Sequence, residues 1–272
     1  MDFIDSFLLG LLQGLTEFLP ISSSGHLVLA KAWLAENIQQ GITFEVVVHF
    51  GTLCSILVYY KDRILEILHA IFRLLSAPTR FREMARNDAD IKLSGYILLS
   101  MIPAMLVGLT LESWIERVLM KPWVASLMLI VTGLILFFTR YVGDTGKPLN
   151  NGRSFTIGLA QALAIIPGIS RSGSTIATGL YLGIKREKVA NFSFLMVIPV
   201  IAGAMLIKVL EIIEMGIPTE ELLSLFIGFL TAFISGYYAL KYLIIILKKQ
   251  GIHYFAYYCW LVGGLGLVYF AL

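Results

Sequence analysis

The sequence has little charge, little cysteine and little histidine. Of its 272 residues, 14% are Asp, Glu, Lys or Arg and 58% are hydrophobic, and the mean hydropathy is +0.83. A soluble domain of this length needs far more polar surface, so the composition indicates a polytopic membrane protein. The two cysteines, Cys54 and Cys259, lie in apolar stretches, and a disulfide framework is not expected.

The balance of charge also excludes some functions. A net charge of +3 is too small to favour a nucleic-acid partner. The first apolar run lacks the basic segment that precedes the core of a cleavable signal peptide, because Asp2 and Asp5 stand there and Glu17 follows. We therefore expect this run to belong to the membrane domain.

Long apolar runs account for most of the chain. Six of them have the length and composition of membrane spans: about 43–60, 92–111, 122–140, 189–208, 222–241 and 253–271. Two further regions, 3–36 and 154–183, are each broken in the middle by proline and a Ser/Gly cluster. Each half is too short to span, so we predict two re-entrant helical hairpins with buried polar turns. The expected fold is an all-α integral membrane protein with about six transmembrane helices plus these hairpins.

Lysine and arginine predict the orientation. They gather in four stretches, which the positive-inside rule puts in the cytoplasm: 61–92, 140–153, 185–188 and 248–251. The stretch 210–221 carries glutamates and neither Lys nor Arg. Both chain ends are then expected outside the cytoplasm, 61–92 is expected to be a cytoplasmic loop, and its part 76–90 is expected to be amphipathic to polar and to lie at the cytoplasmic surface.

This orientation implies an internal repeat. A hairpin followed by three spans occurs twice with opposite orientations, in about 1–140 and about 154–272, within a single membrane domain, 1–272. Inverted-topology repeats have their site near the midplane, where the broken helices meet. The sequence thus predicts one site shared by the two hairpins.

The first hairpin carries a carboxylate in apolar surroundings. Gln13 and Glu17 are four residues apart and share one helix face. A carboxylate and an amide oxygen suit a hard cation such as Mg²⁺ or Ca²⁺. A hydrogen bond that joins two helices explains the pair equally well.

The turn of that hairpin contains Ser22, Ser23 and Ser24, followed by Gly25 and His26. Serines after a helix-breaking proline are suited to capping the next helix. A serine beside a histidine is also the minimum arrangement of a nucleophile and its base, although the sequence shows no third group to orient the histidine.

The second hairpin has the strongest motif, Pro167 to Thr175. One permanent cation, Arg171, lies among hydroxyl side chains and glycines at the start of a new helix; the hydroxyl residues are Ser170, Ser172, Ser174 and Thr175. Such a turn has the character of a phosphate cradle, without the Walker spacing or its lysine. An arginine that reaches the membrane interface fits a hairpin tip poorly.

Glu45 and His49 share a face of the first span. For His49 the sequence favours a hydrogen bond within the helix bundle. For Glu45 both a structural and a functional role stay open.

The two motifs, Gln13 to His26 and Pro167 to Thr175, resemble those of the undecaprenyl-diphosphate phosphatase family associated with bacitracin resistance, and the resemblance covers nearly the whole chain. It implies a bacterial inner-membrane enzyme that removes the terminal phosphate of a prenyl diphosphate lipid with Mg²⁺ or Ca²⁺. It also implies that Glu17, Ser23, His26 and Arg171 form the core of the site, with serine and threonine hydroxyls around the phosphates: Ser22, Ser24, Ser170, Ser172, Ser174 and Thr175.

The expected mechanism has Ser23 attack the terminal phosphorus, or position the water that does, with His26 as base. A lipid-phosphate flippase is the main alternative, because carriers are also built from inverted repeats. Transport would not require the group formed by Glu17, Ser23 and His26. A membrane assembly factor would leave Arg171 and its hydroxyl neighbours unexplained, and a homodimer stays open.

Overall fold

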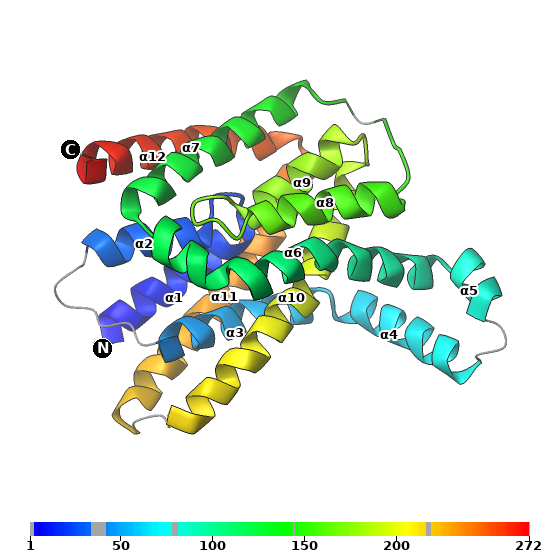
Figure 1. Cartoon of the computed structure of the whole chain (residues 1–272), viewed down its shortest axis with the longest axis horizontal. Helices are drawn as coiled ribbons and strands as arrows, with labels where there is room; N and C mark the ends of the chain where they lie inside the picture. The colour runs from blue at the N-terminus through cyan, green and yellow to red at the C-terminus, as the bar shows by residue number, and fades with distance from the viewer. Residues whose placement is uncertain (1–2, 34–41, 78–80, 144, 216–218, 272) are drawn as a thin grey trace.

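The computed structural model describes residues 3–33, 42–77, 81–143, 145–215 and 219–271, which are almost entirely helical (Figure 1). These residues contain no β-strand, only an isolated bridge between Lys147 and Ile184. The first six helices are α1 (Phe3–Phe18), α2 (Ser23–Trp33), α3 (Ile42–Tyr59), α4 (Lys61–Ser76), α5 (Phe81–Asn87) and α6 (Ala89–Leu119). The others are α7 (Pro122–Phe138), α8 (Asn151–Leu163), α9 (Arg171–Tyr181), α10 (Arg186–Met215), α11 (Leu222–Lys248) and α12 (Phe255–Ala271).

The predicted spans correspond to six of these helices: α3, α6, α7, α10, α11 and α12. In the described part of the chain, five spans are long and apolar enough to cross a membrane by themselves. The sixth, α3, reaches that length only together with α4, from which it is bent by 79°. The all-α integral membrane fold is therefore confirmed.

One prediction was wrong. The stretch 61–92 is not a loop, because Lys61–Ser76 forms the regular helix α4 and Phe81–Asn87 forms α5. In α4 the apolar residues recur at three- and four-residue spacing, and charged residues occupy the other face. The charges kept the stretch below the hydropathy of a span, although the spacing is that of an amphipathic helix.

The first broken region is held by close contact of α1 with α11. A Cβ atom on Gly14 would lie 2.6 Å from the carbonyl oxygen of Ala232, and one on Gly10 would lie 2.5 Å from that of Gly228. Glycine on α1 therefore lets the two backbones approach, as small residues do between membrane helices.

The second broken region packs in the same way on α6. The Ser154 hydroxyl donates to the carbonyl oxygen of Tyr96 at 2.5 Å, and a Cβ atom on Gly158 would lie 2.8 Å from the Cα of Ser100. Each short helix of one half thus lies on a long helix of the other half.

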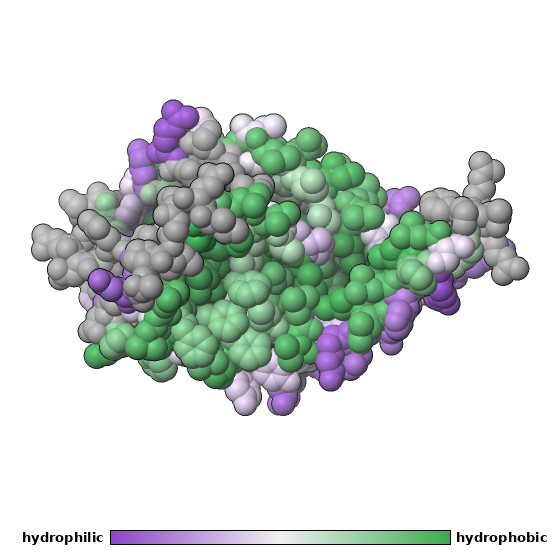
Figure 2. All heavy atoms as spheres, turned by 90° about the horizontal axis from the view of Figure 1, so that it is seen from below, coloured by the Kyte–Doolittle hydropathy of each residue, from purple (hydrophilic) through white to green (hydrophobic). Residues whose placement is uncertain are grey.

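The outer surface is apolar. Large hydrophobic side chains on several long helices are more than half exposed, among them Leu109, Leu206, Phe226 and Leu261. Figure 2 shows the middle of one face covered by hydrophobic residues, with hydrophilic ones at its edges. Such a surface suits lipid rather than water.

Candidate functional site

The site is built from two turns that share a capping hydrogen bond, although the backbone of Ser22 has a φ of +67° and that of Ser170 a φ of −74°. In the first, the hydroxyl oxygen of Ser22 accepts a hydrogen bond from the Gly25 N–H at 3.2 Å and caps α2. In the second, the hydroxyl oxygen of Ser170 accepts from the Gly173 N–H at 3.1 Å and caps α9. The prediction that a serine caps the helix after the first break is confirmed, and the second break is capped in the same manner.

The two turns touch each other directly. A Cβ atom on Gly25 would lie 2.8 Å from the Cα of Gly168, and one on Gly173 would lie 3.3 Å from the Cβ of Pro20. The contact is reciprocal. Gly25 at the start of α2 faces Gly168 of the second turn, and Gly173 at the start of α9 faces Pro20 of the first turn. Glycine at 168 also supplies a φ of +94°, which favours a residue without a Cβ atom.

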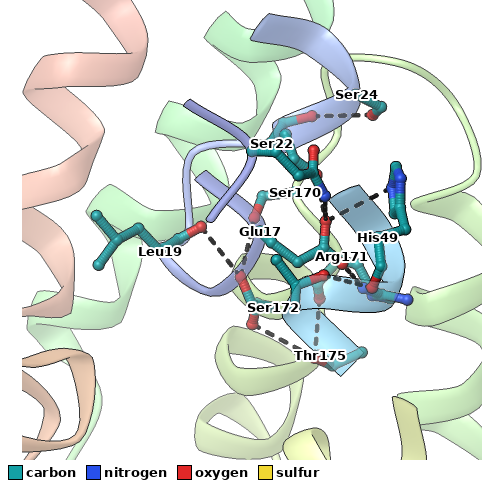
Figure 3. Close-up of polar contacts among 12 residues, drawn as sticks. Glu17, Leu19, Ser22, Ser24, His49, Ser170, Arg171, Ser172 and Thr175 are labelled. Carbon is teal, nitrogen blue, oxygen red and sulfur yellow. Dashed lines mark hydrogen bonds and ion pairs between the residues drawn. The ribbon is translucent and has the colours of Figure 1, made fainter. Parts of the chain in front are cut away.

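Glu17 lies at the centre of this contact, with a side chain only 3% exposed. Its Oε1 pairs with the guanidinium of Arg171, and its Oε2 accepts from the Ser23 hydroxyl at 2.7 Å and from Gln13 Nε2 at 2.9 Å (Figure 3). Three partners, one from α1 and one from the start of each following helix, thus compensate the burial of one carboxylate.

His49 approaches the same carboxylate from α3. Its Nε2 lies 3.9 Å from Glu17 Oε2, and its Nδ1 donates to the backbone oxygen of Glu45 at 2.8 Å. The Nδ1 bond therefore lies within α3 itself, and the other edge of the ring faces the site. The Glu45 carboxylate pairs instead with Lys31 of α2.

His26 is not bonded to the Ser23 hydroxyl, which donates to Glu17. Its Nδ1 lies 2.8 Å from the carbonyl oxygen of Ser22, and its Nε2 lies 2.9 Å from the Tyr258 hydroxyl of α12. The two rings are stacked, with centroids 5.6 Å apart. The arrangement therefore differs from the expected pair of Ser23 and His26.

The other hydroxyl groups mostly bond to one another. Ser22 and Ser24 share a hydrogen bond of 3.3 Å, and Ser170 and Ser172 share one of 3.2 Å. Ser174 is buried, and its hydroxyl has no partner among the residues that the structure describes.

Thr175 connects the second turn to α10. Its hydroxyl donates to the Arg171 carbonyl at 2.8 Å, so the Ser193 hydroxyl, 2.6 Å away, donates to Thr175. Ser193 was not among the predicted residues. Its one signal in the sequence is the weak similarity between Asn191–Phe194 and Thr43–Val46.

A narrow cleft beside the ion pair has a cavity volume of only about 10 Å³. It is lined by residues of both turns and of α10, namely Glu17, Phe18, Arg171, Ser172, Ser193, Phe194 and Val197. The Arg171 side chain is 26% exposed, so protein does not enclose it completely, in contrast to Glu17.

The donor atoms near Glu17 fit a hard cation in part. Gln13 Oε1 is buried and has no partner among the described residues. Those residues hold no cluster of three or more His, Cys, Asp or Glu with metal-binding geometry. An ion such as Mg²⁺ would therefore take Gln13 Oε1 and Glu17 as protein ligands and complete its shell with water and phosphate oxygens.

Fold and site together define an integral membrane protein with a buried polar centre, built around the ion pair of Glu17 and Arg171, between two broken helices. The chain belongs to the family of the bacitracin resistance protein BacA, whose model matches residues 6–265. It is 42% identical over 272 residues to an undecaprenyl-diphosphatase of Salinibacter ruber, covering 98% of this chain and 99% of the relative. It is also 38% identical to one of Methanobrevibacter smithii, over 97% of this chain and 96% of the relative.

Proposed function

We propose that this chain is an integral membrane phosphatase that hydrolyses undecaprenyl diphosphate to the monophosphate and inorganic phosphate. Full-length similarity to undecaprenyl-diphosphatases supports the substrate. The observation that carries the chemistry is the contact of Glu17 with both Arg171 and Ser23. This contact lies in the interior of an apolar protein, beside a cleft. It brings together a cation for phosphate, a hydroxyl nucleophile and a carboxylate that can accept its proton.

The diphosphate is bound by the second turn. Arg171 and the N–H groups at the start of α9 face the phosphates, with hydroxyl groups around them from Ser170, Ser172, Ser174 and Thr175. In the first turn, Ser22 and Ser24 occupy the equivalent places. The prenyl chain lies along the apolar outer surface of the long helices, in lipid.

Ser23 attacks the terminal phosphorus, or positions the water that does. Its hydroxyl already donates to Glu17 Oε2, so that carboxylate takes the proton that the sequence had assigned to His26. The new bond joins Ser23 Oγ to phosphorus, and the bond that breaks leaves the lipid monophosphate. A divalent ion at Gln13 and Glu17, Mg²⁺ or Ca²⁺, would supply charge neutralisation of the phosphates.

The inverted repeat belongs to this proposal. The reciprocal packing of α1 on α11 and of α8 on α6, and the capping hydrogen bond that both turns share, support a repeat of about 1–140 and about 154–272 with re-entrant hairpins 3–36 and 154–183. Residues 34–36 of the first hairpin lie outside the described ones.

The orientation in the bacterial inner membrane is proposed from charge. In Figure 1, α4, α5 and the start of α8 lie at one end of the protein, and the start of α1 and the end of α12 lie at the other. That separation supports cytoplasmic placement of the basic stretches with both chain ends outside. A homodimer remains a prediction.

An assay of the purified protein in detergent tests the function. Phosphate release from undecaprenyl diphosphate is measured with and without EDTA, for the wild type, Glu17→Ala, Arg171→Ala and the control Arg153→Ala, whose side chain bonds the Pro148 carbonyl at the surface. We expect metal-dependent release that both site variants lose and the control keeps. No release from folded wild type across several metals would reject the phosphatase and turn the work to lipid translocation.

A further inference from the structure

Tyr258 is the only described side chain whose polar atom is bonded to His26. The hydroxyl is 2.9 Å from His26 Nε2, and the nearly parallel rings, inclined by 9°, are in stacking contact. Tyr258 comes from the last helix, 232 positions after His26. No motif in the sequence connects the two, because an aromatic residue in an apolar span is usually a packing residue.

The hydrogen bonds determine which nitrogen of His26 carries the proton. A carbonyl oxygen can only accept, so the Nδ1 that faces the Ser22 carbonyl is the protonated nitrogen. Nε2 then has the free lone pair, and the Tyr258 hydroxyl donates to it. The accepting nitrogen of His26 therefore faces the Tyr258 hydroxyl on α12.

We propose that Tyr258 is a positioning residue for the phosphatase reaction, which fixes the ring plane of His26 through the hydrogen bond to Nε2. This inference rests on the proposed function. In the resting site, Tyr258 keeps His26 Nε2 aimed at one place, where a water molecule that attacks the phosphorylated enzyme can replace the tyrosine hydroxyl and lose its proton to Nε2. The bond formed is from the water oxygen to phosphorus, the bond broken is from phosphorus to Ser23 Oγ, and the serine oxygen recovers its proton from Glu17.

The fold supports this role. Both α2 and α12 pack on α7, so His26 and Tyr258 are carried by two helices that share a neighbour. The first turn is also linked to α12 through Cys259, whose thiol lies 3.8 Å from the Pro20 carbonyl oxygen. The helix that supplies Tyr258 therefore packs against the turn that precedes His26 and shares a neighbouring helix with it.

The test compares Tyr258→Phe with Tyr257→Phe. Phenylalanine at 258 keeps the stacked ring and removes only the hydroxyl, while the neighbouring Tyr257 makes ring contacts with Phe137 and Trp260 and is 50% exposed. We expect kcat to fall about tenfold in Tyr258→Phe with KM unchanged, because orienting partners of functional histidines have effects of this size. Tyr257→Phe should keep the wild-type kcat.

Two further measurements separate positioning from packing. Because both side chains act through one nitrogen, His26→Gln with Tyr258→Phe should lose no more activity than His26→Gln alone. In ¹⁵N spectra of histidine-labelled protein, the His26 Nε2 signal, assigned with His26→Gln, should show an unprotonated acceptor and should shift in Tyr258→Phe only.

An unchanged kcat in Tyr258→Phe, losses that multiply in the double variant, or an unaffected Nε2 signal would each overturn the proposal while leaving the phosphatase intact. A folded wild type without phosphate release would instead reject the proposed function, and with it the role of Tyr258 in that reaction. The spectra would still decide whether Tyr258 holds His26.

Discussion

Glu17 and Arg171 form an ion pair across the two turns, although 154 positions separate them in the chain. The Glu17 side chain is 3% exposed and that of Arg171 is 26% exposed. The carboxylate is therefore enclosed by protein, whereas the Arg171 side chain is not enclosed completely and lines the cleft. An anion in the cleft would meet an arginine that is already oriented.

We expect Arg171→Lys to reduce phosphate release by about 10²- to 10³-fold, roughly 3–4 kcal/mol of transition-state stabilisation. Lysine keeps the charge but lacks the planar fork that can hold Glu17 and a phosphate together. The measurement is kcat/KM with the prenyl diphosphate in detergent. The control is Arg153→Lys, at a surface arginine bonded to a backbone carbonyl, which should retain wild-type activity. Equal activity of the two variants would contradict the role given to Arg171.

Ser23→Ala should lower kcat by more than about a hundredfold, because alanine removes the hydroxyl that contacts Glu17. Brief incubation of the wild type with terminally ³²P-labelled substrate, followed by acid quench, should leave label on the protein, and Ser23→Ala should leave none. The control is Ser94→Ala in α6, where the hydroxyl donates to the Asp90 carbonyl of the same helix. Full activity of Ser23→Ala would exclude the serine, and lost activity without trapped label would favour direct attack by water.

The spans were predictable from sequence because hydropathy is a local property. Each of the six apolar runs became a helix within several residues of the expected bounds, and α6 and α10 run further because polar flanks continue the helical pattern. The helix α4 was missed because its average hydropathy is low. Its apolar stripe is diluted by charges on the other face, so average hydropathy hides a periodic signal.

The inner contacts were harder to predict. Proline, serine and glycine spacing shows where each helix breaks, but not which atoms meet across the break. That His49 reaches Glu17 depends on how α3 lies against α1. That His26 faces Tyr258 and not Ser23 depends on α12, and nothing near either residue in the sequence reports it.

Changing Gln13 tests the proposed cation. Gln13→Glu adds a second carboxylate beside Glu17, so the Mg²⁺ concentration for half-maximal activity should fall about tenfold, since affinity follows the number of charged ligands. Gln13→Leu removes the buried amide oxygen and should raise that concentration. The measurement is phosphate release during titration of Mg²⁺ into EDTA-stripped protein. Identical titration curves for both variants and the wild type would argue against Gln13 as a ligand.

Gly168→Ala should destabilise the protein rather than act on chemistry alone. The residue has a φ of +94°, and an added Cβ atom would lie 2.7 Å from the Cβ of Met128 and 3.0 Å from the carbonyl carbon of Ala125. Left-handed backbone alone costs a residue with a Cβ atom about 1–2 kcal/mol. We therefore expect the melting temperature in detergent to fall by about 5 °C or more.

The matched control is Gly264→Ala in α12, where an added Cβ atom meets nothing within 4 Å and helix propensity should leave stability equal or slightly higher. If Gly168→Ala had the same melting temperature as Gly264→Ala and the wild type, the close packing of the second turn on α7 would not be a source of stability.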